Sequence, residues 1–282
     1  MWSLERAARA RAPTRRSARR WQRPYVGAVS RDDPFATVEI AGARRSLVAL
    51  GGTLDAPTLV SAYRAGCFPW PSSGEDAKEL ERTARRLVRR GEVPLLPGED
   101  GLVPWCSPEP RAVLLPDGIV VRRSLRTRLR SCGWLSTVDT AFDDVVAGCA
   151  DRAEGTWITP RMQQAYSELH RAGGAHSVEI WQGPALVGGL YGVLVGQVFC
   201  GESMVHRASD ASKVALVELG TRLGAGGVRL IDVQEETPHL ASMGQVLMHR
   251  ADYLSVLATL RDRPGRLEPG RLPVARLAPL RG

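Results

Sequence analysis

The fold of this chain is decided by two short runs, Val198-Phe199-Cys200-Gly201-Glu202-Ser203-Met204 and Leu230-Ile231-Asp232-Val233-Gln234. Both are typical of strands, and residues 209–223 between them have the pattern of a helix. Successive side chains of a strand alternate between its faces, so Asp232 and Gln234 share one face. An acid in an otherwise apolar strand needs a partner or a function, because burying it alone is costly. We therefore expect Glu202 to lie near the Asp232/Gln234 pair.

Length and composition indicate a globular protein with one large domain or two modest ones. The chain has 282 residues, of which 44% are hydrophobic, and that is enough for a proper core. No apolar run approaches the roughly 20 residues that cross a bilayer, and the first residues have no apolar signal-peptide core. The five cysteines are widely spaced without a Cys-x-x-Cys pair, which argues against a disulfide framework and a zinc knuckle. We expect a cytoplasmic protein with reduced cysteines and no membrane partner.

The net charge of +8 comes almost entirely from arginine. A basic balance favours a polyanionic partner, of which nucleic acid is the commonest. Codon bias in a GC-rich genome explains the arginine usage equally well, so both interpretations stay open. Many of these arginines fall in residues 1–34, which we predict to be a disordered basic arm. The arm is either a non-specific RNA-binding segment or a passive extension.

Residues 35–108 are predicted to form a small N-terminal α/β domain. A helix begins after the N-cap residue Asp55 and ends at Gly66. Phe68-Pro69-Trp70-Pro71 follows, in which the prolines fix an extended backbone. Trp70 then either lines a pocket or plugs the core. Residues 74–101 are a charged excursion with helical spacing, for which we favour a solvent-facing helix over an RNA site.

Residues 109–264 are predicted to form the catalytic domain. Short strands and helices alternate after the proline-rich run 105–111, and an antiparallel meander leads into the opening stretch. Thr159 and Pro160 begin one of these helices, as N-cap and first helical residue. A cluster of arginines without an intervening acid predicts a phosphate-binding patch, namely Arg122, Arg123, Arg126, Arg128 and Arg130. Residues 265–282 form a tail rich in proline and arginine.

This order of elements predicts an α+β fold with an acetyltransferase (GNAT)-like C-terminal domain. A CoA-dependent N-acetyltransferase is therefore the alternative function. Such enzymes hold pyrophosphate on a glycine-bearing loop at the start of the helix that follows the central strand. Residues 206–213 fill that place here without a glycine and with Asp210 among them. The CoA interpretation is weakened, although Arg207 and Lys213 remain available for another phosphate.

Eight motifs together resemble the leucyl/phenylalanyl-tRNA–protein transferase family. The resemblance covers about residues 48–262 without the excursion, and it depends on the joint order of the motifs rather than on any one of them. The motifs are Phe68-Pro69-Trp70, Trp105-x-Ser107-Pro108-x-Pro110-Arg111, Glu154-Gly155-Thr156-Trp157-Ile158-Thr159, His176-Ser177-Val178-Glu179, Gly188-Gly189-x-Tyr191-Gly192, Phe199-x-Gly201-Glu202-Ser203-Met204, Ala211-Ser212-Lys213 and Leu230-Ile231-Asp232-x-Gln234.

The resemblance implies transfer of Leu or Phe, and less often Met, from aminoacyl-tRNA to the N-terminal Arg or Lys of a protein, which tags that protein for degradation. It implies an acetyltransferase-like catalytic domain that uses neither metal nor CoA. An aminoacyl ester is already activated, so the enzyme must mainly position an amine, take its proton and stabilise the tetrahedral intermediate. A non-catalytic RNA-binding module remains a third possibility.

The resemblance also implies roles for individual residues. Asp232 and Gln234 would be the catalytic pair, with Glu202 orienting the donor or the cationic acceptor. The side-chain carbonyl of Gln234, polarised by an amide hydrogen bond to Asp232, would accept a hydrogen from the attacking amine. The pocket for the side chain and the terminal adenosine would comprise Tyr63, Trp70, Trp157, Tyr166, Leu190, Phe199 and Met204. The tRNA would contact Arg122, Arg123, Arg126, Arg128, Arg130, Arg207 and Lys213.

Overall fold

The structure is a computed structural model that describes residues 33–71, 75–152 and 155–278, without the side chains of 75–80. Nearly all of the predicted basic arm, residues 1–32, lies outside the described residues, as does Glu154 of the quoted motifs. None of the described helices combines the length and hydropathy that crossing a membrane requires. All five cysteines are free thiols.

An eight-stranded sheet forms the centre of the molecule, and its strand order is β11-β5-β10-β9-β8-β7-β6-β12. The predicted meander is confirmed, because β7, β8 and β9 pair antiparallel in sequence order. In contrast, β9 and β10 pair parallel, which requires a crossover such as a helix. The strands are β5 (Arg111–Leu114), β6 (Leu135–Val138), β7 (Ala175–Gln182), β8 (Ala185–Val195), β9 (Val198–His206), β10 (Leu230–Gln234), β11 (Val246–Met248) and β12 (Leu272–Pro273).

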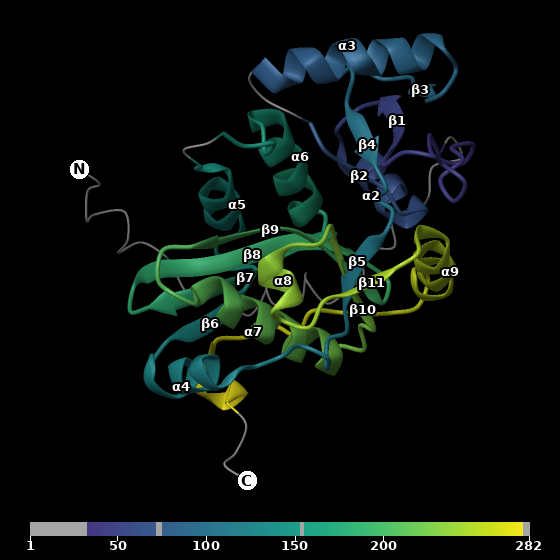
Figure 1. The fold of residues 1–282 in the computed structure, drawn as a ribbon. Coiled ribbons are helices and arrows are strands. Elements are labelled where there is room, and N and C mark those ends of the chain that lie inside the picture. The colour runs from purple at the N-terminus through teal and green to yellow at the C-terminus, as the bar shows by residue number, and fades with distance from the viewer. Residues whose placement is uncertain (1–32, 72–74, 153–154, 279–282) are drawn as a thin grey trace, which may run out of the picture.

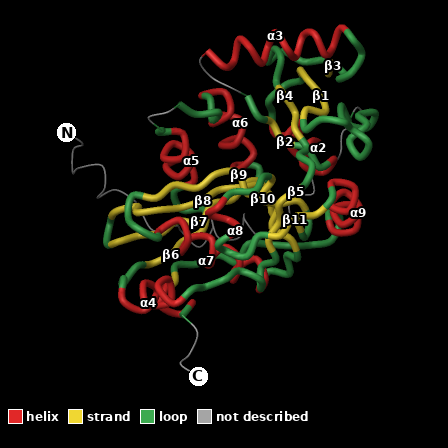
Figure 2. Tube along the Cα trace, viewed as in Figure 1, coloured by secondary structure: helices red, strands yellow, loops and turns green. Residues whose placement is uncertain are grey.

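Helices cover both faces of this sheet, which confirms the α+β class (Figure 1). The crossover helix α7 (Ala211–Ala225) lies on one face, and α5 (Phe142–Ala150) and α6 (Pro160–Arg171) lie on the other. Figure 2 shows the strands passing between these two layers of helices. The predicted start of α6 is confirmed, because the Thr159 side chain accepts a hydrogen bond from the backbone N–H of Met162. Helix α4 (Arg123–Ser131) lies on the α7 side.

A second sheet has four strands in the order β2-β4-β1-β3. Its strands are β1 (Leu47–Gly51), β2 (Phe68–Pro69), β3 (Leu95–Leu96) and β4 (Pro104–Cys106), and its helices are α2 (Ala56–Ala65) and α3 (Glu75–Arg89). Helix α2 has the predicted caps, with Asp55 at its start and Gly66 in the left-handed conformation at its end. The predicted excursion 74–101 is integrated into the fold: Ala84 and Leu87 of α3 are buried, and β3 pairs parallel with β1.

The two sheets share one hydrophobic core. Leu59 and Trp105 of the small unit belong to the same cluster as Val145 of the large one. The buried Arg250 begins α9 (Arg250–Leu260) and ties the units together, because its Nη1 donates to the carbonyl oxygens of Ser107 at 2.7 Å and Arg45 at 3.0 Å. The proline-rich run 105–111 therefore connects two sheets within a continuous core.

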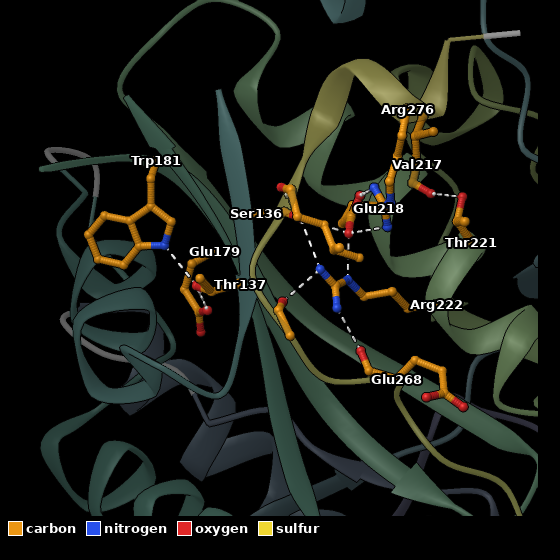
Figure 3. A network of polar contacts seen from close by, with 12 residues as sticks. Ser136, Thr137, Glu179, Trp181, Val217, Glu218, Thr221, Arg222, Glu268 and Arg276 are labelled. Carbon is orange, nitrogen blue, oxygen red and sulfur yellow. Dashed lines mark hydrogen bonds and ion pairs between the residues drawn. The ribbon is translucent and has the colours of Figure 1, made fainter. Parts of the chain in front are cut away.

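The predicted tail is part of the fold over its described residues. Strand β12 pairs with β6 at the edge of the large sheet, and the short helix η2 (Val274–Leu277) follows it. The Arg276 side chain donates two hydrogen bonds to Glu218 of α7, at 2.6 and 2.7 Å (Figure 3). This contact joins residues 265–278 to the crossover helix.

Candidate active site where two parallel strands diverge

Glu202 and Gln234 meet in the gap where β9 and β10 separate. The parallel pairing ends with Cys200 opposite Asp232. Past this point each strand contains an irregularity, since Glu202 is an extra residue relative to β8 and the pairing with β5 shifts between Asp232 and Gln234. Bulges of this kind turn side chains away from the regular alternation. The Gln234 Nε2 donates to Glu202 Oε1 at 2.8 Å, which confirms the predicted proximity of these two residues.

Asp232 lies beneath this pair, fully buried and fully paired. Arg111 donates to both of its carboxylate oxygens, from Nε at 2.8 Å and from Nη2 at 2.6 Å, and the Tyr253 hydroxyl donates at 2.8 Å. The Arg111 guanidinium also lies over the rings of Phe68 and Tyr253, 5.0 and 4.4 Å from their centroids. All of these contacts hold the Asp232 carboxylate in one orientation beneath the pair.

The predicted hydrogen bond between the Gln234 side-chain amide and Asp232 is wrong. Asp232 Oδ1 instead accepts the backbone N–H of Gln234 at 3.0 Å, and the amide donates to Glu202. The physical reason is the left-handed backbone of Gln234, with φ 69°, which breaks the alternation that the prediction assumed. No hydrogen bond to the side-chain carbonyl Oε1 of Gln234 is found among the described residues, so that acceptor is available to a ligand.

Glu202 is surrounded by neutral hydrogen-bond donors. The Tyr166 hydroxyl donates to its Oε2 at 2.7 Å, and the hydroxyls of Tyr63 and Tyr166 are 2.5 Å apart. Burial raises the pKa of Glu202 to about 7, and the hydrogen bonds only partly oppose this shift. Burial and the nearby Glu202 charge raise the pKa of both tyrosines well above the ordinary value, so they remain protonated donors.

An aromatic wall lies on the α2 and α6 side of the site. Trp70 and Trp157 are half-buried and stacked, with centroids 5.5 Å apart and planes inclined by 19°. Phe68 packs next to Trp70 at 5.8 Å. Tyr63 and Tyr166 are buried in the same hydrophobic cluster, against which both tryptophans pack.

The other three predicted pocket residues pack on the opposite face of the sheet. Leu190 and Phe199 are buried in the second hydrophobic cluster with α7, and the half-buried Met204 packs against it. Leu190 and Met204 face one another across β8 and β9. The seven predicted pocket residues therefore form two groups, one on each side of the strands that carry Glu202 and Gln234.

The predicted RNA-binding cations make no hydrogen bond or ion pair to Glu202 or Gln234 among the described residues. Four arginines of the α4 segment are exposed, while Arg128 lies over the Trp134 ring at 5.8 Å. Asp210, at the start of α7, accepts a hydrogen bond from Lys213 Nζ at 2.9 Å and lies 3.7 Å from Arg128 Nε. The chain's own carboxylate thus partly neutralises two of the seven predicted cations at this helix terminus.

Three contributors to the site were not predicted as site residues. Arg111 belongs to a quoted motif, and a buried acid in an apolar strand was a usable signal that such a cation exists. Tyr253 carries no comparable signal in the sequence. Arg152 approaches the site from the end of α5, where its Nη2 donates to Ser203 Oγ at 3.2 Å. Among the described residues, no group of three His, Cys, Asp or Glu side chains is arranged to hold a metal ion.

Comparison with known proteins identifies a matching family. The family described as Leucyl/phenylalanyl-tRNA protein transferase matches residues 113–258, and its N-terminal domain matches residues 52–78. The first range contains Glu202, Asp232 and Gln234, and the second contains Tyr63 and Trp70.

Individual relatives carry the corresponding name, leucyl/phenylalanyl-tRNA–protein transferase. One from Chromohalobacter salexigens is 48% identical over 214 residues, covering 75% of this chain and 73% of the relative. One from Stutzerimonas stutzeri is 47% identical over 221 residues, covering 77% and 86%. One from Shewanella baltica is 43% identical over 221 residues, covering 77% and 82%. The similarity therefore extends across both sheets.

Proposed function

The chain belongs to the leucyl/phenylalanyl-tRNA–protein transferase family, and we propose that it transfers Leu or Phe, and less often Met, from aminoacyl-tRNA to the N-terminal Arg or Lys of acceptor proteins. The transfer marks the acceptor for degradation. The observation that supports this reaction best is the contact between Glu202 and Gln234. The side-chain amide of Gln234 donates to Glu202, while the side-chain carbonyl of Gln234 remains available to a ligand. Aminoacyl-tRNA and the acceptor are cytoplasmic, so we place the protein there.

The proposed chemistry requires little beyond positioning. The α-amine of the acceptor attacks the ester carbon, a C–N bond forms, and the C–O bond to the ribose breaks. One amine proton is lost and the departing ribose oxygen gains a proton. Gln234 Oε1 accepts an N–H of the incoming amine and aligns its lone pair with the ester. Ionised Glu202 accepts from the Gln234 amide at 2.8 Å and makes the carbonyl a stronger acceptor.

Asp232 is a positioning residue in this mechanism. Its hydrogen bond to the Gln234 backbone supports the left-handed conformation from which the side chain reaches Glu202. Arg111 and Tyr253 fix the Asp232 carboxylate in turn. Tyr63 and Tyr166 act in the same way on Glu202, since their hydroxyls form a chain that ends at its Oε2.

The two groups of pocket residues suggest two subsites for the donor. We assign the terminal adenine to the stacked Trp70 and Trp157, because every base has a face that stacks on indole. We assign the Leu or Phe side chain to the opposite side of the strands, next to the half-buried Met204, which packs against the cluster that contains the buried Leu190 and Phe199. In this arrangement the ester lies at the Glu202–Gln234 pair between the subsites.

The acceptor stem would be bound mainly through its phosphates. We assign this contact to Arg207 and to the exposed arginines Arg122, Arg123, Arg126 and Arg130 of the α4 segment. Arg128 and Lys213 contribute less, because Asp210 partly neutralises both. Phosphate contacts predict binding that depends weakly on stem sequence and strongly on salt.

We propose an acetyltransferase-like architecture for the large unit, supported by its meander and by the β9-α7-β10 crossover. The chemistry of a CoA-dependent N-acetyltransferase is disfavoured. The start of α7 holds the Asp210 carboxylate between two cations, where such enzymes bind pyrophosphate.

A transfer assay tests the proposal. Purified protein is incubated with Leu-tRNA or Phe-tRNA and a peptide that begins with Arg, and mass spectrometry detects the extended peptide. We expect extension of Arg-initiated and Lys-initiated peptides but not of an acetylated control peptide. Gln234→Ala should lose about 100-fold or more in kcat/KM, as when an oriented polar group is removed from a transition state, while tRNA binding persists. Absence of any new peptide bond would refute the function.

A further inference from the structure

Arg152 is a cation at the edge of the site with no role in the proposed chemistry. Its side chain is exposed and is held at two points. Nε donates to the carbonyl oxygen of Cys149 at 3.1 Å, and Nη2 donates to Ser203 Oγ at 3.2 Å. Ser203 directly follows Glu202 in β9, so the guanidinium is fixed one residue away from the group that orients Gln234.

This guanidinium retains most of its donor capacity. No carboxylate forms an ion pair with Arg152 among the described residues. A guanidinium has five N–H donors, and the two hydrogen bonds use only two of them. The C-terminal end of α5 supplies the Cys149 carbonyl, and the negative end of a helix dipole favours a cation there. The side chain is thus oriented in advance for an anion that arrives from solvent.

A second arginine lies along the same helix. Arg207 follows β9, and a Cβ atom added at Gly148 of α5 would lie 3.6 Å from its Nη2. No ion pair to Arg207 is found within the described part of the chain. Arg152 and Arg207 therefore lie one after the other along the edge between α5 and β9, at increasing distance along β9 from Glu202. Two guanidinium groups in sequence along one edge suit a chain of phosphates better than a single carboxylate.

The donor carries an anion at a fixed distance from its ester. In an aminoacyl adenosine, the ester oxygen and the 5′-phosphate are bound to the same ribose ring. A donor whose ester lies at Gln234 and whose adenine stacks on the wall of Trp70 and Trp157 must leave this phosphate at the rim of the site. Arg152 follows the end of α5 and Trp157 precedes the start of α6, so these two side chains would hold the terminal nucleotide by its phosphate and its base.

We propose that Arg152 binds the phosphate that joins the terminal adenosine of the tRNA to the preceding nucleotide, and that Arg207 follows it along the strand. This assignment rests on the proposed function and adds a subsite to it. Arg152 places the ester through the phosphate and does not touch the reacting carbon. Its contribution therefore depends on whether the donor has a phosphate at that position.

Donors that differ only in this phosphate test the assignment. One donor is adenosine with phenylalanine esterified at the 3′-oxygen and a free 5′-hydroxyl. The second is the same molecule with a 5′-phosphate, and the third is Phe-tRNA. Each is assayed for transfer to an Arg-initiated peptide by the unchanged protein, Arg152→Ala and Arg152→Lys. Arg171→Ala is the matched control, because Arg171 is also exposed and donates from Nη2 to a serine hydroxyl, at 3.3 Å.

We expect Arg152→Ala to lose about 10- to 100-fold in kcat/KM with the two phosphate-bearing donors, the range for a charge-assisted hydrogen bond. With the phosphate-free donor it should resemble the unchanged protein. Arg152→Lys should recover part of the loss, and Arg171→Ala should lose nothing with any donor. Equal losses with all three donors, or no loss with the phosphate-bearing ones, would overturn the assignment. Absence of transfer by the unchanged protein from every donor would instead overturn the proposed function, and the phosphate subsite with it.

Discussion

Two glutamates, the buried Glu218 and the half-buried Glu202, lie on opposite sides of the large sheet and have opposite surroundings. Glu218 of α7 accepts hydrogen bonds from Arg222 Nε at 2.5 Å and from Ser136 Oγ at 2.8 Å, in addition to the two from Arg276 (Figure 3). Among the described residues, the partners of Glu202 are tyrosine hydroxyls and an amide. Burial acts to raise the pKa of both, but the ion pairs hold the pKa of Glu218 below its ordinary value, while the pKa of Glu202 rises to about 7.

This difference indicates that Glu218 has a structural role and Glu202 a chemical one. The charge of Glu218 is neutralised by Arg222 and Arg276. Together with Arg222, which also donates to the carbonyl oxygens of Glu268 at 2.7 Å and Gly270 at 3.0 Å, Glu218 connects α7, β6 and the C-terminal segment. No cation of the described chain pairs with Glu202, so its ionised form is less stable in the folded protein, and it can respond to an arriving ligand. A carboxylate at a site that must accept a cationic peptide terminus should be of the second kind.

The substitution Arg222→Met tests the structural role of Glu218. It leaves Glu218 with Arg276 as its remaining cation and removes the hydrogen bonds to two carbonyl groups. Breaking a buried ion pair costs about 3–5 kcal/mol, and we expect a loss of that size in the free energy of unfolding, measured by urea denaturation. Transfer activity per folded molecule should be unchanged. The control is Arg266→Met, since this exposed arginine pairs with the Glu268 side chain and should cost less than about 1 kcal/mol. A variant of normal stability would contradict the structural role of Glu218.

The substitution Glu202→Gln tests the chemical role of Glu202. The change keeps the shape but removes the charge that polarises the Gln234 amide, so we expect about a 100-fold loss of kcat/KM, equivalent to about 2.7 kcal/mol. In the unchanged protein, activity should rise with pH through about 7 as Glu202 ionises. Tyr63 and Tyr166 stay protonated in this range, because the pKa of each is raised well above its ordinary value. The variant should keep only the pH dependence of the acceptor amine, and a pH profile unchanged from that of the parent would exclude this role.

The same substitution should have a smaller and opposite effect on stability. The pKa of Glu202 is about 7 in the folded protein against an ordinary value of 4.5, so the folded state binds its proton more tightly. Its contribution to folding is fully present below about pH 4.5 and declines as pH rises through about 7. Glu202→Gln removes this decline, and we expect it to gain about 1–2 kcal/mol relative to the parent between pH 5 and pH 8, after allowance for solvent screening. Urea denaturation at both pH values measures the difference.

Glu179 also affects the stability in this pH range, but its effect cancels when parent and variant are compared. Burial also raises the pKa of Glu179 to about 7, but this residue is present in both proteins and affects them equally. The stability difference between parent and variant should therefore follow the titration of Glu202 alone. A difference that did not change with pH would show that Glu202 titrates normally.

Local signals in the sequence predicted the elements around the site. Asp55, Gly66 and Thr159 are capping residues that can be recognised from neighbouring positions, and they mark the start of α2, the end of α2 and the start of α6. The order of short strands predicted the meander, and two strands joined by one helix predicted the approach of Glu202 to Gln234. These predictions succeeded because they depend on residues that are close in sequence or on a regular period.

The details of the site depend on contacts between distant residues. Arg111 and Tyr253 reach Asp232 from separations of 121 and 21 residues, and nothing local specifies either partner. The left-handed backbone of Gln234 is uncommon for a residue other than glycine, so regular alternation gave the wrong partner for its amide. Strand β12 has only two residues and is stabilised by its pairing with β6 rather than by a pattern of its own.

The most direct test of the central claim is a double-mutant cycle between Glu202 and Gln234. The transfer rate from Phe-tRNA to an Arg-initiated peptide is measured under kcat/KM conditions for the parent, Glu202→Gln, Gln234→Ala and the double variant. If the hydrogen bond makes the two residues one functional unit, their effects should be strongly non-additive. We predict that Glu202→Gln, which costs about 100-fold in the parent, costs less than about threefold once Gln234 is alanine. A double variant whose loss equals the product of the two single losses would contradict the account.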